Sequence, residues 1–329
     1  MLFSPVKNDP GPPPDRGTRA WLQVLAGCLI NALTWGYSAS FGVYQLYYTE
    51  HLHFSPSQAS WIGSVQVFMT FFIGVFSGRS TDAGMAQETV LLGFAWAVRV
   101  QGFITLGFSI VIMALLRPRL PPRKSGPIME LSAFREPPYS FFAVGMFFIF
   151  WALFFGFFYI NSYATSVLGV SAETAANLLV IVNAVGIPTR PLVGLVSDRL
   201  LGPLPTLIWS SIFLSVMLFV WIPVKSVGGM YAWVVLYGIA TGGTQGVFVG
   251  ALVSLTSDPA RMGTRFGMVF SLFGFATLAG PPTGGGIIET MNNNYVGAQA
   301  WAGAVTITGT LFITAAFYAD RKAKAGSTQ

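Results

Sequence analysis

The chain has 329 residues, of which 53% are hydrophobic and only 9% are charged. Soluble domains carry about 25% charged residues, so this composition excludes a soluble globular protein and predicts an all-α polytopic membrane protein. The net charge of +6 does not indicate a nucleic-acid partner, because the lysines and arginines lie mostly in short segments between apolar runs. The single cysteine, Cys28, excludes an intrachain disulfide framework.

The chain opens with a polar, proline-rich stretch over residues 1–19 that has no apolar core, which predicts a disordered cytoplasmic tail and no signal peptide. About nine apolar segments follow, each near the roughly 20 residues that cross a bilayer. They are Trp21–Tyr47, Trp61–Ser77, Val90–Leu116, Phe141–Ser162, Ala175–Val196, Leu204–Val224, Met230–Leu255, Phe266–Ile288 and Ala300–Tyr318.

The predicted organisation is two unequal halves joined by a basic stretch. We expect an incomplete N-terminal helical half over residues 20–116 and a basic cytoplasmic linker over 117–138. A six-helix C-terminal half over residues 139–319 and a cytoplasmic tail over 320–329 complete the chain. Basic and neutral loops largely alternate in the C-terminal part, which places the linker and the C-terminus on the cytoplasmic side.

The N-terminal part conflicts with the positive-inside rule. The basic tail and the basic linker should both be cytoplasmic, but only three spans separate them, and an odd number of spans cannot join two segments on one side. The charge pattern therefore predicts that an odd number of helices is missing near residues 84–90. The alternatives are a re-entrant third segment or a translocated tail.

One arginine, Arg190, lies in the middle of an apolar segment, between Pro188 and Pro191. A cation at bilayer depth is costly, so it is expected to face the bundle interior or a watery cavity. The two prolines remove backbone donors and loosen the helix beside it. Arg190 is therefore the leading substrate-binding candidate, able to hold a carboxylate or phenolate by a charge-assisted bond. The alternative is a structural arginine that bonds neighbouring carbonyls.

Polar and aromatic residues in other spans are weaker candidates for the same cavity, since each is more often a helix–helix hydrogen bond than a ligand contact. They are Asn31, Tyr37, Gln45, Tyr159, Asn161 and Gln245.

A short pattern repeats at the ends of two spans, Gly78 to Asp82 and Gly194 to Asp198, each Gly-x-x-x-Asp. Glycines allow close helix approach, and paired signals in two halves are typical of repeat-built transporters. The predicted gate and structural residues are Gly74, Gly78, Asp82, Gly84, Gly194, Asp198, Arg199, Pro188 and Pro191.

Several stretches resemble the major facilitator superfamily, and more narrowly the fungal branch of the monocarboxylate porters. They are residues 15–21, Thr34 to Gln45, Ser60 to Gln66, Asn183 to Arg199, Gly263 to Gly267 and Gly280 to Gly284. The resemblance implies a helical bundle of twelve spans in two halves. On that plan this chain lacks helices three, four and most of five, with the junction near Gly84–Leu92.

The resemblance also marks a departure. Monocarboxylate porters have a first-helix lysine and an eighth-helix Asp-x-x-x-Arg, but Val43 and Gly186 stand at the lysine and aspartate positions here. Proton coupling through an acid–arginine pair is therefore not expected from these residues. A coupling proton that binds elsewhere stays an alternative. Fungal relatives include exporters of larger metabolites such as polyketides.

The sequence thus predicts a secondary active transporter of an organic anion, a monocarboxylate-like acid or a secondary metabolite, working by alternating access in the lipid bilayer, with the plasma membrane as its location. The alternative is a truncated, non-transporting membrane protein. A membrane-bound enzyme is a weaker idea, because no Walker loop, dinucleotide loop or metal-ligand spacing is present, and no cofactor is expected.

Overall fold

A computed structural model describes residues 129–256, Asp258 and residues 261–326, together with Leu22, Ser55, Ser57, Gln58, Ser60, Trp61, Ser64 and Val67. The first and third predicted spans therefore lie almost wholly outside the described residues. Of the second, Trp61, Ser64 and Val67 are helical, as predicted, and the helix already includes Ser57, Gln58 and Ser60.

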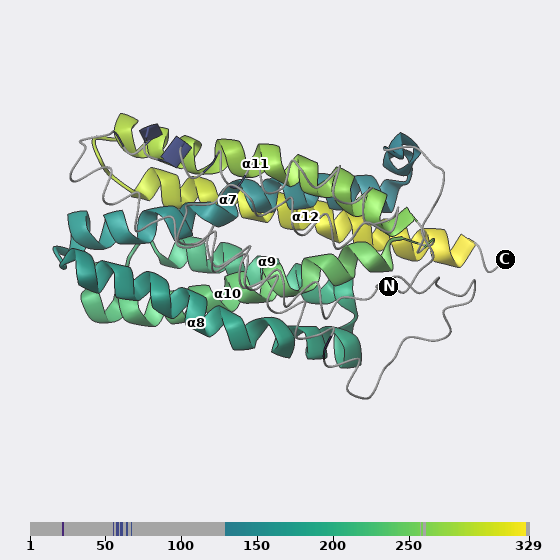
Figure 1. Ribbon diagram of the computed structural model, residues 1–329, viewed down its shortest axis with the longest axis horizontal. Helices are drawn as coiled ribbons and strands as arrows, with labels where there is room; N and C mark the ends of the chain where they lie inside the picture. Colours follow the sequence, from purple (N-terminus) through teal and green to yellow (C-terminus); the bar gives the residue numbers. More distant parts are fainter. Residues whose placement is uncertain are drawn as a thin grey trace, which may run out of the picture. The chain divides into compact units, whose positions relative to one another are not determined.

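Six described helices are long and apolar enough to cross a membrane, and each overlaps one of the six segments predicted for the C-terminal part (Figure 1). A short 3₁₀ helix, η1 (Leu131–Arg135), precedes them. The long helices are α7 (Pro137–Leu168), α8 (Ala172–Val196), α9 (Pro203–Val220), α10 (Val227–Ser254), α11 (Met262–Thr290) and α12 (Val296–Gly326).

Local sequence signals explain the helix ends. Helix α7 begins on Pro137, where a missing N–H does no harm, and stops at Gly169, whose φ of 67° is left-handed. The Ser171 hydroxyl accepts a hydrogen bond from the Thr174 amide and so caps α8. Ser226 caps α10 in the same way.

Helix α8 has an irregular end. Pro188 and Pro191 lie inside it, and each removes one backbone donor from the helical ladder. After Val196 the chain continues as a π-helical turn, η2 (Ser197–Leu201), which ends at Gly202 with a φ of 82°. Only 22% of the most apolar stretch of α8 is buried, against 72% in α7, so α8 is the less enclosed of the two helices.

The chain divides into two compact units. The larger contains Ser38–Phe72, Leu131–Ser257 and Leu272–Gln329, and the smaller contains Met1–Tyr37, Ile73–Glu130 and Asp258–Ser271. Within the larger unit, α7 packs on α12, α9 on α10 and α12, and α8 on α10. Gly145 and Gly309 allow the α7 and α12 backbones to approach closely, because a Cβ on either would lie within 2.8 Å of the opposite helix.

Three glycines spaced one turn apart form the contact of α10 with α8, and we call them the glycine seam: Gly238, Gly242 and Gly246. A Cβ at Gly246 would lie 3.0 Å from the Arg190 Cα, and one at Gly242 would lie 3.1 Å from the Gly186 Cα. The seam therefore sets the position of the α8 backbone at Arg190.

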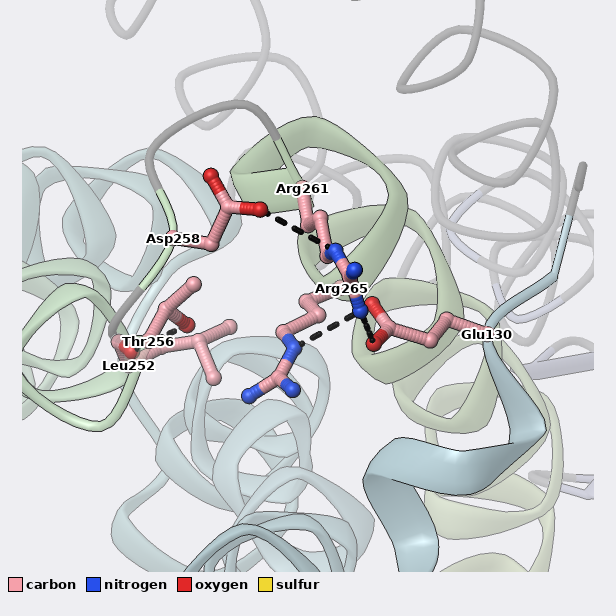
Figure 2. A network of polar contacts seen from close by, with 6 residues as sticks. All are labelled: Glu130, Leu252, Thr256, Asp258, Arg261 and Arg265. Atoms are coloured by element: carbon pink, nitrogen blue, oxygen red, sulfur yellow. Dashed lines mark hydrogen bonds and ion pairs between the residues drawn. The ribbon is translucent and has the colours of Figure 1, made fainter. Parts of the chain in front are cut away.

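In the smaller unit, one carboxylate joins two arginines at the beginning of α11 (Figure 2). The Arg261 Nη1 lies 2.7 Å from Glu130 Oε1, and the Arg265 Nε lies 3.4 Å from Glu130 Oε2. The Glu130 and Arg265 side chains are buried, whereas Arg261 is half exposed and also pairs with Asp258 at 3.0 Å. The sequence pattern presents these residues only as loop charges and did not predict the cluster.

Burial alone would raise the pKa of the Glu130 carboxyl, but hydrogen bonds from Arg261 and Arg265 and their positive charges outweigh it, so the net pKa lies below the ordinary 4.5. The same hydrogen bond raises the pKa of Arg261. The cluster therefore stays ionised at neutral pH.

The glycine seam predicts a difference between two neighbouring glycines of α10. Gly246→Ala forces α8 away at Arg190 and is expected to lower the free energy of unfolding by about 1–3 kcal/mol. Gly250→Ala, one turn further on, meets no atom within 4 Å and should be neutral or stabilise by up to about 1 kcal/mol. Thermal unfolding of the two variants in detergent measures both effects, and equal midpoints would contradict the packing role.

The ion cluster predicts a pH-dependent stability. Glu130→Gln removes the charge of the carboxylate that Arg261 and Arg265 share and should lower the free energy of unfolding by about 2 kcal/mol, between the values for exposed and buried pairs. Because the folded-state pKa of Glu130 is depressed, its contribution is complete above pH 4.5 and is lost as the pH falls through the folded-state pKa. Thermal midpoints of wild type and variant should therefore converge in acid. The control, Asp258→Asn, weakens the half-exposed pair with Arg261 and should change stability by less than about 1 kcal/mol.

Candidate functional site

The structure brings together two of the predicted substrate-binding residues, Arg190 on α8 and Gln245 on α10. The Arg190 Nη2 donates a hydrogen bond of 2.6 Å to Gln245 Oε1. Gln245 is 6% exposed, and the Arg190 side chain is partly buried. The glycine seam makes this contact possible, since Gln245 precedes Gly246 and the two helix backbones touch there.

The Arg190 guanidinium keeps unused hydrogen-bonding capacity. Its Nε is buried and has no hydrogen-bond partner, and no ion pair of Arg190 occurs within the described part of the chain. A neutral amide satisfies one N–H but does not compensate a positive charge. An uncompensated cation beside apolar helices is costly, so the site favours an anion.

Gly186 lies one helical turn before Arg190 and is buried where α8 meets α10. A Cβ built there would lie 3.8 Å from Arg190 Nη1, which is an ordinary contact distance. The sequence supplies no acidic side chain at this position. The positive charge of Arg190 thus stays available within its own helix.

Aromatic rings surround the next turn of α10. Phe248, three residues after Gln245, packs its ring edge against Phe150 of α7 at 5.5 Å between ring centroids. Phe150 stacks on Phe273 of α11 at 4.4 Å. All three rings are buried, so this aromatic cluster packs α7, α10 and α11 together.

Two further candidates on α7 behave differently. The Tyr159 hydroxyl donates to the carbonyl of Pro281 on α11 at 3.1 Å, which gives this residue a structural bond. Asn161 is fully buried, and neither atom of its side-chain amide has a hydrogen-bond partner. An unsatisfied buried amide is costly and is typical of functional positions, so Asn161 stays a candidate.

The predicted gate residues that the structure describes lie on the second half of α8 and on η2. A Cβ at Gly194 would meet no atom within 4 Å, so the close helix approach expected there occurs instead at the glycine seam. Asp198 and Arg199 are exposed on η2, and Pro188 and Pro191 are exposed on α8. The remaining candidates lie outside the described residues: Asn31, Tyr37, Gln45, Gly74, Gly78, Asp82 and Gly84.

One polar contact at the far end of α11 was not predicted. The backbone N–H of Ser57 donates a hydrogen bond of 2.7 Å to the Glu289 carboxylate. Ser55 and Gln58 bond each other reciprocally, the Gln58 amide to Ser55 Oγ and the Ser55 amide to Gln58 Oε1. This capping box, Ser-x-x-Gln, is a readable sequence signal for a helix start at Ser55, but it does not reveal the partner Glu289.

Comparison with known proteins identifies the family. The family model of the Major Facilitator Superfamily matches residues 89–281. An MFS-type transporter of Gibberella zeae is 34% identical, with 94% of this chain and 89% of the relative covered. The aspyridones efflux protein of Emericella nidulans is 28% identical, with 94% and 80% covered.

Solved structures show the same fold. The human organic anion transporter TETRAN is similar with a TM-score of 0.53 and 14% identity, covering 90% of this chain and 88% of that one. A bacterial homologue of the human lysosomal transporter Spinster gives the same score and identity, covering 94% and 98%. Together with the apolar helices and the curated relatives, these matches show that the chain is an integral, multi-pass membrane protein and belongs to the Major Facilitator Superfamily of transporters.

Proposed function

We propose that this chain is a secondary active transporter that moves an organic anion, a monocarboxylate-like acid or an acidic secondary metabolite, by alternating access. Its location is the plasma membrane, with both termini in the cytoplasm, as the basic linker and tails indicate. The two halves would rock around a central site near the bilayer midplane.

The Arg190–Gln245 pair carries this proposal. The guanidinium has a fixed position, a buried and unpaired Nε, and no carboxylate partner among the described residues. A substrate carboxylate, enolate or phenolate would supply the missing charge and accept from the free N–H groups. Gln245 would orient the guanidinium, since its Oε1 already engages one amino group.

The relatives favour an acidic secondary metabolite over a small monocarboxylate. They include efflux proteins for aspyridones in Emericella nidulans and for agnestins in Paecilomyces divaricatus, the latter 26% identical. These relatives support export of a secondary metabolite.

A proton stays a candidate for co-transport with the anion. An acidic side chain beside Arg190 would not carry it. Gly186 occupies the position one turn earlier and carries no titratable group. We therefore expect anion binding itself to depend little on pH near neutrality, unless the anion titrates.

The proposal predicts that Arg190→Ala strongly weakens anion binding and slows transport. Losing a hydrogen bond to a charged group weakens affinity roughly 10- to 100-fold. Gly186→Asp should act similarly, because its carboxylate would neutralise Arg190 from one turn away. The measurements are flux in proteoliposomes and ligand-induced thermal shifts, with planar aromatic carboxylic acids and their methyl esters as probes.

Arg199→Ala is the matched control, since Arg199 follows the same helix but is exposed. The Arg199→Ala variant should bind the acids like the wild type. The uncharged esters should bind equally to the wild-type protein and to the Arg190→Ala variant. Unchanged acid transport by Arg190→Ala would remove Arg190 from the site.

A second candidate is a truncated membrane protein that does not transport. Length favours it: the Gibberella zeae relative aligns over 394 positions, whereas this whole chain has 329 residues. The relative therefore contains residues, inside the matched region, with no counterpart here. Losing three helices of one half would remove part of the cavity wall and the symmetry that alternating access requires.

Reading the transcript across Gly84–Leu92 separates these candidates. If the missing helices were lost from this form alone, end-to-end cDNA sequencing should reveal a longer message with about 80–90 extra residues, roughly three spans. The longer protein should then transport and this chain should not. Anion flux by the 329-residue chain itself would refute the truncated candidate.

A further inference from the structure

A carboxylate near the Thr290 end of α11 binds the beginning of another helix. Ser55 and Gln58 cap that helix, so Ser57 lies in its first turn, where backbone N–H groups have no acceptor within the helix. Glu289 Oε1 accepts from the Ser57 N–H at 2.7 Å. A negative charge at this position is also favoured by the helix dipole.

Three further contacts surround this bond and show that the two helices meet closely. The Ser57 hydroxyl is 3.4 Å from the Pro282 carbonyl, to which it donates. A Cβ at Gly285 would lie 2.8 Å from both N and Cα of Ser57 and would collide with the Tyr159 hydroxyl. Only a glycine at this position lets α11, α7 and the Ser57 helix come together.

The bond joins residues 232 positions apart, one before and one after the basic linker. We propose that Glu289 and the Ser57 N–H form a latch that holds this end of the transporter closed. The inference rests on the proposed alternating access, in which the segments before and after the linker separate at one end and then at the other. Opening at the Thr290 end breaks the latch and uncovers Ser57.

The latch differs from an ordinary salt bridge because its donor is backbone. Every substitution at Ser57 except proline keeps the backbone N–H, so a cysteine can report on the opening without removing the bond. Ser57→Cys loses only the weak contact to Pro282. Glu289 is exposed, and its substitution leaves no buried charge behind.

The test measures how fast Ser57→Cys reacts with a membrane-impermeant maleimide in the full chain, with Cys28→Ser as background. Glu289→Ala should increase the labelling rate about tenfold, the factor expected for losing a hydrogen bond to a charged group. Glu289→Gln, which keeps an acceptor but no charge, should lie in between. Glu173→Gln, an exposed acid in the first turn of α8, should leave the rate unchanged.

A second variant opens the same contact by sterics. Gly285→Ala leaves Glu289 intact but forces the helices apart, and it should also speed labelling. Monodisperse elution of each variant confirms that it is folded. Equal labelling rates in the parent, Glu289→Ala and Gly285→Ala proteins would overturn the latch.

The labelling assay needs no substrate, so it separates this inference from the proposed function. On an Arg190→Ala background, which should transport slowly, the response of Ser57→Cys to Glu289→Ala should persist. Slowed transport with a retained labelling response supports both proposals, whereas transport that is unchanged by Arg190→Ala counts only against the anion site.

Discussion

The backbone contact between α8 and α10 determines where the charge of Arg190 lies. Gly242 and Gly246 have no side chains, and the α8 backbone occupies the space that a Cβ would take. This approach brings Gln245 within 2.6 Å of the guanidinium. In a membrane no hydrophobic driving force pairs two apolar helices, so packing of small residues and polar contacts must do it. The glycine seam thus holds α8 and α10 together and also fixes the position of the Arg190 guanidinium.

Two charged sites among the described residues follow different physical rules. At the beginning of α11, Glu130 and Asp258 pair with Arg261 and Arg265, so that cluster contains a balanced set of charges without a ligand. Arg190 has only a neutral amide, and its Nε is unpaired. A cluster whose charges are paired stabilises a structure, whereas a cation without a counter-charge favours the binding of an anion. This contrast is the reason for assigning substrate recognition to α8 and not to the more strongly charged end of α11.

Hydropathy predicted the six helices after the linker, because about 20 apolar residues are enough to specify a span. It did not predict their full lengths. Helix α12 continues past Tyr318 to Gly326 through charged residues, including a Lys324–Asp320 pair at 2.7 Å, which hydropathy counts as a tail. Proline at the beginning of α7 and Ser171 before α8 were readable signals that would have moved the predicted ends outward.

The site was predicted only residue by residue. Arg190 is evident from sequence because a cation interrupts an apolar run, and Gln245 was one polar candidate among several. Their pairing depends on the register of α8 against α10, and a single sequence contains no information on register. Tyr159 differs, since its hydroxyl bonds the Pro281 carbonyl of another helix. The two residues are 122 positions apart in the sequence, so this contact also depends on how the helices pack.

The pairing of α7 with α12 has a consequence for biosynthesis. The first of the six long helices to be made packs along the last, through Gly145 and Gly309 and through ring contacts such as Trp151 with Trp301. Helix α7 therefore enters the bilayer with one face prepared for a partner that the ribosome has not yet synthesised. Until α12 is inserted, that face must lie against lipid or an insertion chaperone. Assembly of these six helices is thus completed only at the end of translation.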